Sequence, residues 1–292
     1  MKITTSIPHQ PLAGMLWGTL GVLLFAAGLP ATRIAVLEMP SLFVGAGRAW
    51  LGAVLALMLL LLTRQRLPTP RQWLRLSLVA TGVVFGYPIL SSIALESVSA
   101  THGVLVTALL PLCTALFGAF LNQHWPRAGF WLCAVAGSAL VLFYAGQQAQ
   151  GHWQQADLLL LLACVLCGIG YAEGARLTRE LGSWQVICWA LVLSLPLLTP
   201  LTWHSRPVLA DTSPAGWLSM LYLGSCSMFL GFFFWYRGLA LGGVPQVSQV
   251  QLLQPFGALW LAALLLGESL SAQTIWICLA VVACVALGRR YA

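Results

Sequence analysis

Apolar runs of about 20 residues follow one another along almost the whole chain, and this pattern limits its fold more than any other feature. The runs cover approximately 12–35, 41–63, 73–95, 98–121, 128–146, 156–176, 184–203, 214–236, 243–266 and 272–288. A helix of about 20 apolar residues crosses the hydrocarbon core of a bilayer. Charged residues make up only 7% of the chain, against about 25% in soluble domains. The sequence therefore predicts an all-α membrane protein with ten transmembrane helices.

The basic residues predict its orientation. When the loops between the runs are assigned alternately to the two sides of a membrane, eleven basic residues fall on the side of the amino terminus: Lys2, Arg64, Arg66, Arg71, Arg75, Arg127, Arg176, Arg179, Arg237, Arg289 and Arg290. Only Arg33 and Arg206 fall on the other side, and Arg48 lies inside the second run. Cytoplasmic loops are enriched in Lys and Arg. We therefore expect a multi-pass protein of the inner (plasma) membrane with both termini in the cytoplasm.

The two halves of the chain resemble each other. A shift of 144 residues places Pro111 on Pro255, and the spans that follow then coincide. We therefore expect residues 1–147 and 148–292 to be two copies of one five-helix unit. Because five is odd, the second copy enters the membrane from the opposite side, so the halves are inverted repeats. Such repeats are common in secondary transporters, whose substrate site lies near the midplane between them.

Several short motifs occur in the order and spacing of a known repeat. They are Trp17-Gly18 in the first span, Arg48 in the second, Ile93-Ala94-Leu95 before Ser99-Ala100, Pro111 in the fourth, and Leu266-Gly267-Glu268-Ser269-Leu270-Ser271 after Pro255. On these residues the chain resembles the EamA-type family of the drug/metabolite transporter superfamily over essentially its whole length. The resemblance implies ten helices, inverted halves and export of small metabolites. Amino-acid exporters, including an aromatic amino-acid branch, are among the relatives it points to.

Arg48 is the clearest charged residue inside a predicted span. It lies seven residues after Ser41, which is roughly 10 Å along a helix. A charge at this depth is costly, and such residues usually serve a function. Two interpretations remain open: the guanidinium contacts an anion or carboxylate in a cavity, or it clamps helix-end carbonyls or Glu38.

The ninth span is unusually polar. It contains Gln246, Ser248, Gln249, Gln251 and Gln254 before its proline. Amide side chains need partners when they are surrounded by lipid. We expect Gln246 and Gln254 to line a wet cavity, with Thr107 as a candidate in the corresponding helix of the first half.

Aromatic side chains away from the expected membrane interfaces suggest the walls of that cavity. The candidates for substrate binding are Phe25, Tyr87, Tyr171, Trp235 and Tyr236. Aromatic walls suit aromatic or apolar solutes. The alternative is that these rings pack in the core or face lipid.

Glycines and prolines indicate close packing and bending. Gly14 with Gly18 has the spacing that allows helices to approach closely in lipid. Proline inside a helix removes a backbone donor and favours a kink. The candidate hinges for alternating access are Gly28, Pro30, Gly86, Pro88, Pro111 and Pro255. Ordinary helix bending is the alternative.

Two acidic residues are expected to serve local structure. Glu173 precedes Arg176 by three residues, so we expect an ion pair on one helix face. Glu268 is expected to cap the helix end before the last span. The eight cysteines all lie in apolar segments, which indicates packing rather than disulfides.

These features favour a secondary transporter that exports small metabolites, such as amino acids or related aromatic and apolar compounds, by alternating access. A passive channel remains an alternative. An intramembrane enzyme is disfavoured because no HExxH, GxSG or DxxxD motif occurs. We expect no cofactor and no metal. The expected partners are a small-molecule substrate and the lipid bilayer, not nucleic acid; the oligomeric state is open, with a monomer as one possibility.

Overall fold

The computed structural model describes residues 10–121, 127–148, 154–207, 212–242 and 247–291, and all regular structure in these ranges is helical. The helices of the first half are α1 (Pro11–Ala26), α2 (Gly28–Val36), α3 (Ser41–Leu62), α4 (Pro70–Val79), η1 (Ala80–Gly86), α5 (Tyr87–Ser97), α6 (Ala100–Thr107), α7 (Leu110–Leu121) and α8 (Ala128–Gln148). Those of the second half are α9 (Gln155–Leu181), α10 (Ser183–His204), α11 (Pro214–Leu221), η3 (Tyr222–Leu230), α12 (Gly231–Gly242), η4 (Ser248–Leu253), α14 (Gln254–Leu266) and α15 (Ala272–Arg289).

Seven helical stretches in the described residues are long and apolar enough to cross a membrane: Leu12–Val36, Ser41–Leu62, Pro70–Ser97, Ala100–Leu121, Gln155–Leu181, Ser183–His204 and Pro214–Leu241. Three further apolar stretches are shorter: Ala128–Gly137, Gln254–Leu266 and Ala272–Gly288. Large apolar side chains such as Leu62 and Trp276 are exposed on the helix surfaces. A bilayer is the solvent that accommodates such a surface. The chain is therefore a multi-pass membrane protein.

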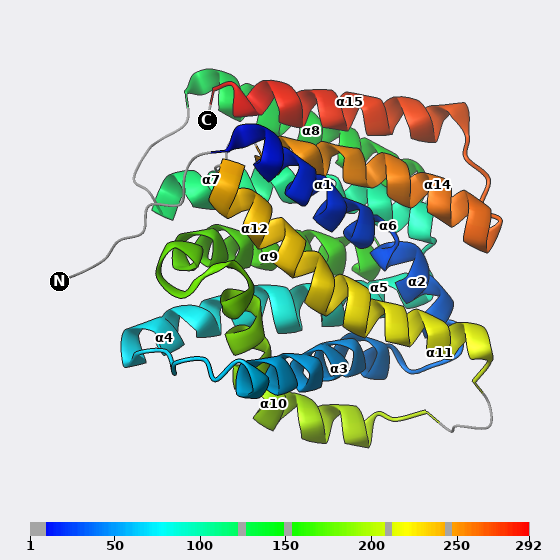
Figure 1. Cartoon of the computed structure of the whole chain (residues 1–292). Helices are drawn as coiled ribbons and strands as arrows, with labels where there is room; N and C mark the ends of the chain where they lie inside the picture. Colours follow the sequence, from blue (N-terminus) through cyan, green and yellow to red (C-terminus); the bar gives the residue numbers. More distant parts are fainter. Residues whose placement is uncertain (1–9, 122–126, 149–153, 208–211, 243–246, 292) are drawn as a thin grey trace.

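Hydrogen bonds join the helix ends into two sets. We call one end the arginine-rich end, because it carries Arg64, Arg66, Arg71 and Arg75. Here the amide of Gln10 donates to the Leu241 carbonyl over 2.9 Å, and the amide of Arg127 donates to the Tyr291 carbonyl over 2.7 Å. Figure 1 shows the start of α1 and the end of α15 on this same side of the molecule.

The opposite end carries Glu38, Glu96 and Glu268, and we call it the acidic end. Here Glu96 accepts from the amide of Ser41 over 3.1 Å, which joins the end of α5 to the start of α3. Several helices that begin at this end have a hydroxyl cap. Ser99, Ser213 and Ser271 each accept a hydrogen bond from an amide in the first turn of α6, α11 and α15. Such caps satisfy donors that a helix leaves unpaired and so fix where it begins.

Several of the helical passes are irregular. The lengths of the apolar runs did not predict these irregularities. The predicted first span is divided at Ala27 into α1 and α2. The fourth pass of each half is divided shortly before Pro111 or Pro255. The third pass of each half contains a π-helical segment, η1 and η3, and the same shift of 144 residues that relates the two prolines places η1 inside η3. π-Helical insertions are frequent at functional sites.

The predicted hinge residues lie beside these irregularities. Gly28 and Pro30 follow the division between α1 and α2. Gly86 ends η1, and Pro88 is in the first turn of α5. Pro111 and Pro255 are the second residues of α7 and α14. Their action as hinges remains a prediction.

Close packing of α1 against α12 joins the two halves. A Cβ atom on Gly238 would lie 2.7 Å from the amide nitrogen of Gly18 and 2.8 Å from the carbonyl oxygen of Gly14. These distances leave no room for a side chain. The packing role predicted for Gly14 and Gly18 is confirmed.

Candidate functional site

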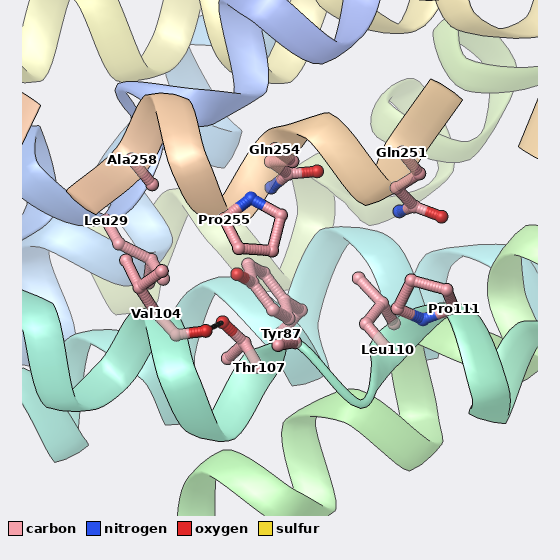
Figure 2. A pocket seen from close by; sticks show the side chains of 11 residues that line it. Leu29, Tyr87, Val104, Thr107, Leu110, Pro111, Gln251, Gln254, Pro255 and Ala258 are labelled. Carbon is pink, nitrogen blue, oxygen red and sulfur yellow. Dashed lines mark hydrogen bonds between the residues drawn. The ribbon is translucent and has the colours of Figure 1, made fainter. Parts of the chain in front are cut away.

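A pair of adjoining cavities lies between the two halves. Leu29, Tyr87, Leu110 and Gln254 line both of them. One cavity is bordered by the divided fourth passes, and Figure 2 shows the ring of Tyr87 beside Pro255, with Leu110 between Tyr87 and Pro111. The other is bordered by residues of both halves, including Arg48 from α3 and Tyr171 from α9. We call the pair the central cavity.

Arg48 is buried in the wall of the central cavity and has no carboxylate partner among the described residues. Its side chain is 3% exposed. Nη1 donates to the Thr32 hydroxyl over 3.0 Å and Nη2 to the Ser91 hydroxyl over 3.2 Å, while Nε has no partner. A buried guanidinium usually pairs with an anion. The geometry suits an arginine that receives its counter-charge from a ligand.

The alternative interpretation of Arg48 was a structural clamp on helix-end carbonyls or on Glu38. Its guanidinium donates to two hydroxyl groups instead. Glu38 accepts from the amide and the hydroxyl of Ser213, each over 2.8 Å. The clamp on Glu38 is wrong for this structure, because another partner occupies that carboxylate.

Aromatic rings form one side of the central cavity. Phe25, Tyr171 and Phe232 line it, and the centroid of Phe232 lies 5.0 Å from that of Phe25 and 6.0 Å from that of Tyr171. Trp235 and Tyr236 pack behind these three rings, with Trp235 6.1 Å from Tyr171 and Tyr236 5.6 Å from Phe232. We call the three lining rings the aromatic wall.

Two amides face the cavity from the divided fourth pass of the second half. Gln251 and Gln254 both line the cavity, and Figure 2 shows their side chains on the same divided segment as Pro255. Gln251 is 2% exposed, and neither its oxygen nor its nitrogen has a hydrogen-bond partner within the part of the chain that the structure describes. A buried amide without partners is costly. These groups can bond a polar ligand or water.

The structure brings together most of the residues expected to bind substrate. Phe25, Arg48, Tyr87, Thr107, Tyr171 and Gln254 all line the central cavity. Trp235 and Tyr236 do not, because their helix register turns them behind the aromatic wall, where they are 1% and 0% exposed. Gln246 lies outside the described residues. No ligand tests these assignments, so substrate binding remains a prediction.

Several residues that line the cavity were not anticipated as binding residues, and four of these are polar, aromatic or thiol-bearing. They are Cys167, Ser227, Phe232 and Gln251. Phe232 was hidden among neighbouring aromatic residues of an apolar run, and only the register of α12 distinguishes it. Gln251 was noticed as polar, yet nothing in its spacing separated cavity from helix contact.

Ion pairs between the halves close the arginine-rich end. Arg75 of α4 pairs with Glu173 and Glu180 of α9. Glu173 also pairs with Arg176 over 3.2 Å, as the spacing predicted. The same end holds a vestibule of about 480 Å³ whose lining includes Arg64 and Arg66.

Carboxylates of one half bind the other half at the acidic end. Glu268 accepts from the amides of Ala100 and Thr101 over 2.8 and 2.7 Å. The expectation that Glu268 caps the last span is wrong, because Ser271 performs that role and Glu268 caps α6 instead. Glu38 in turn caps the start of α11 through Ser213.

The central cavity is small in this conformation. Its two parts measure about 20 and 40 Å³, whereas a site for a drug-sized ligand measures roughly 300 Å³ or more. Polar contacts join the halves on both sides of it. In this conformation the cavity therefore has no room for a solute of that size. Among the described residues, no group of three His, Cys, Asp or Glu side chains could hold a metal ion.

Comparison with known proteins relates this geometry to a family. The EamA-like transporter family matches the chain twice, over residues 12–145 and 154–288. A Bacillus subtilis (strain 168) protein described as "Uncharacterized transporter YdeK" is 46% identical over 283 residues, covering 96% of this chain and 98% of that protein. A solved structure titled "Crystal structure of protein" has the same fold, with a TM-score of 0.67 and 20% identity over 95% of this chain and 96% of that chain. The chain belongs to the EamA-like transporter family.

Proposed function

We propose that this protein is a secondary transporter for small metabolites that combine a carboxylate with an apolar or aromatic part, such as amino acids. The observation that carries the proposal is the buried Arg48 guanidinium, which faces the central cavity without a carboxylate partner. The aromatic wall lies in the same cavity and offers rings to an apolar side chain. An arginine binds a carboxylate in a planar, two-bond arrangement.

Alternating access between two inverted five-helix halves is the mechanism we propose. It is supported by the two family matches and by the shift of 144 residues that relates the irregular passes of the halves. The hydrogen bonds that link helix ends at the arginine-rich and acidic ends also support it, because passes that alternate in direction would place their ends at two opposite faces. Contacts between the halves exist at both ends, so rocking would break one set while the other holds.

The arginine-rich end is proposed to face the cytoplasm of the cell that holds the protein in its inner membrane. Lys and Arg are enriched in cytoplasmic loops, and Arg64, Arg66 and Arg71 lie at this end. Both termini would then be cytoplasmic. Export is the proposed direction, and it rests on the resemblance to metabolite exporters.

Counterflow in proteoliposomes tests the proposed function. Vesicles loaded with unlabelled phenylalanine should accumulate labelled phenylalanine transiently and saturably. They should not accumulate phenylalaninamide, which keeps the ring and the amino group but lacks the carboxylate. A panel of amino acids, amines and sugars would then define the range of substrates.

The opposite results would exclude the proposal. Linear flux without saturation or counterflow would indicate a channel. Equal counterflow of phenylalanine and its amide would exclude a role for the carboxylate and for Arg48 as its partner. Counterflow confined to solutes without a carboxylate would exclude the proposed substrate class.

A further inference from the structure

A buried histidine and aspartate connect the two halves at the acidic end. Nε2 of His102 in α6 lies 2.5 Å from Oδ1 of Asp157 in α9. Their side chains are 6% and 1% exposed. Neither residue lines the central cavity, so the substrate site does not explain them. They are 55 residues apart in the chain, and no local pattern predicts their contact.

The pair is placed to control access to the central cavity. The helix of His102 continues directly to Val104 and Thr107, which line the cavity. The helix of Asp157 continues to Cys167 in the cavity wall. Separation of α6 from α9 at this end would therefore move two walls of the cavity apart.

Other polar groups surround the pair. The second oxygen of Asp157 accepts from the amide of Gln154 over 3.3 Å, and Glu268 binds the first turn of α6. Arg33 of α2 and Glu96 of α5 are the charged residues of the neighbouring helices at this end, and the exposed His204 ends α10. The turns of α7, α8, α14 and α15 nearest the pair contain no Asp, Glu, His, Lys or Arg among the described residues.

We propose that His102 and Asp157 form a proton-binding site that holds the acidic end closed. Protonated His102 and the Asp157 carboxylate form a neutral ion pair with a charge-assisted hydrogen bond, which is roughly twice as strong as a neutral one. Loss of the proton leaves a net negative charge in a buried position, which favours separation and hydration of the carboxylate. Proton binding therefore favours closure, and a rise in pH favours opening.

Among the described residues, the ion pairs at the arginine-rich end offer no such response. The groups that close it are Arg75, Glu173, Glu180 and Arg176. Histidine is the side chain that ordinarily titrates between pH 5 and 8, and this network contains none. The two ends would thus differ in their response to pH in that range. The inference rests on the proposed transport cycle for its role, but the site itself can be measured without a substrate.

Hydrogen exchange of the full-length protein in lipid nanodiscs provides the test. The exchange rate of amides at the starts of α6 and α9 is measured in wild type and in His102→Gln at pH 5.5 and 7.5. Glutamine can still donate to Asp157 but does not titrate. The ratio of the two rates at each pH cancels the intrinsic pH dependence of exchange.

The expected result concerns the exchange rate of wild type divided by that of His102→Gln. This ratio should fall by about three- to tenfold as the pH drops from 7.5 to 5.5. Asp157→Asn should behave like His102→Gln, and the control Glu96→Gln should behave like wild type. A ratio that is the same at both pH values would overturn the proposal, and so would a pH response retained in Asp157→Asn. If the counterflow experiment fails while the ratio changes, the proton site stands and the transport assignment does not.

Discussion

Arg48 is held against Thr32 rather than against a carboxylate. Nη1 of Arg48 donates to the Thr32 hydroxyl over 3.0 Å, and that hydroxyl donates to the carbonyl of Gly28 over 2.6 Å. The charge is thereby anchored at the division between α1 and α2. This anchor keeps the guanidinium at the cavity wall, where the proposed function gives it a substrate carboxylate as its partner.

Arg48→Gln should lower counterflow of a carboxylate-bearing substrate by about tenfold or more, because a hydrogen bond to a charged group contributes about 1.5–3 kcal/mol. Arg48→Lys should retain part of the activity, since it keeps the charge but loses the planar fork. Arg206→Gln is the control, because Arg206 stacks on Trp203 away from the cavity. Wild-type transport by a normally inserted Arg48→Gln protein would contradict this role.

Phe232→Ala should lower transport of aromatic substrates by about tenfold while small aliphatic substrates are affected less, because stacking and apolar contact are lost. Phe234→Ala is a matched control on the same helix, since the Phe234 ring stacks on Trp17, 5.6 Å away, and does not line the cavity. Counterflow assays with both substrate classes measure the difference. Equal losses for the two variants would argue against the aromatic wall.

Gln251→Leu should raise the free energy of unfolding by about 1–3 kcal/mol, because it removes a buried amide whose two polar atoms have no partner. The same substitution should reduce transport, since the cavity loses a polar group. Gln273→Leu is the comparison, because it breaks a hydrogen bond to Gln147 instead. Thermal unfolding in detergent measures whether Gln251→Leu is more stable than wild type and Gln273→Leu less stable. Destabilisation by Gln251→Leu would show that the Gln251 amide is paired in the native membrane protein.

Glu268→Gln should destabilise the first turn of α6 by about 1 kcal/mol, because an acidic cap bonds free amides and interacts with the helix dipole. Hydrogen exchange should rise at Ala100 and Thr101 and stay unchanged at the start of α15. Ser271→Ala should produce the reverse pattern, since Ser271 caps α15. An effect of Glu268→Gln confined to α15 would restore the sequence-based expectation.

The sequence predicted the helical architecture because run length and charge placement carry that information. Apolar runs separated by basic loops place the helices, and they do so within a few residues for α3 and α10. The family resemblance is confirmed by matches over both halves. The divided and π-helical passes were not predicted. An apolar run has the same residue types whether each backbone amide bonds the carbonyl four residues earlier, as in an α-helix, or five residues earlier, as in a π-helix.

The site was predicted in part. Arg48 was identifiable because a charge in a span is rare. Tyr87 was identifiable as an aromatic residue away from the expected membrane interfaces, and Gln254 as an amide in an unusually polar span. Whether a ring lines a cavity or packs behind it depends on helix rotation, which apolar runs do not encode. This is why Trp235 was expected in the wall and Phe232 was not. Contacts between distant positions, such as that of Glu268 with α6, leave no local pattern at all.

The native Cys167 allows the most direct test of the central claim that substrate occupies the cavity between the halves. Cys167 lines the cavity and is 2% exposed, so a thiol reagent reaches it only when one end opens. Site-resolved mass spectrometry would measure its modification by N-ethylmaleimide with and without saturating phenylalanine. The account predicts that phenylalanine slows the reaction of Cys167 and that Arg48→Gln abolishes this protection. An unchanged rate at Cys167 under a substrate that the protein demonstrably transports would contradict it.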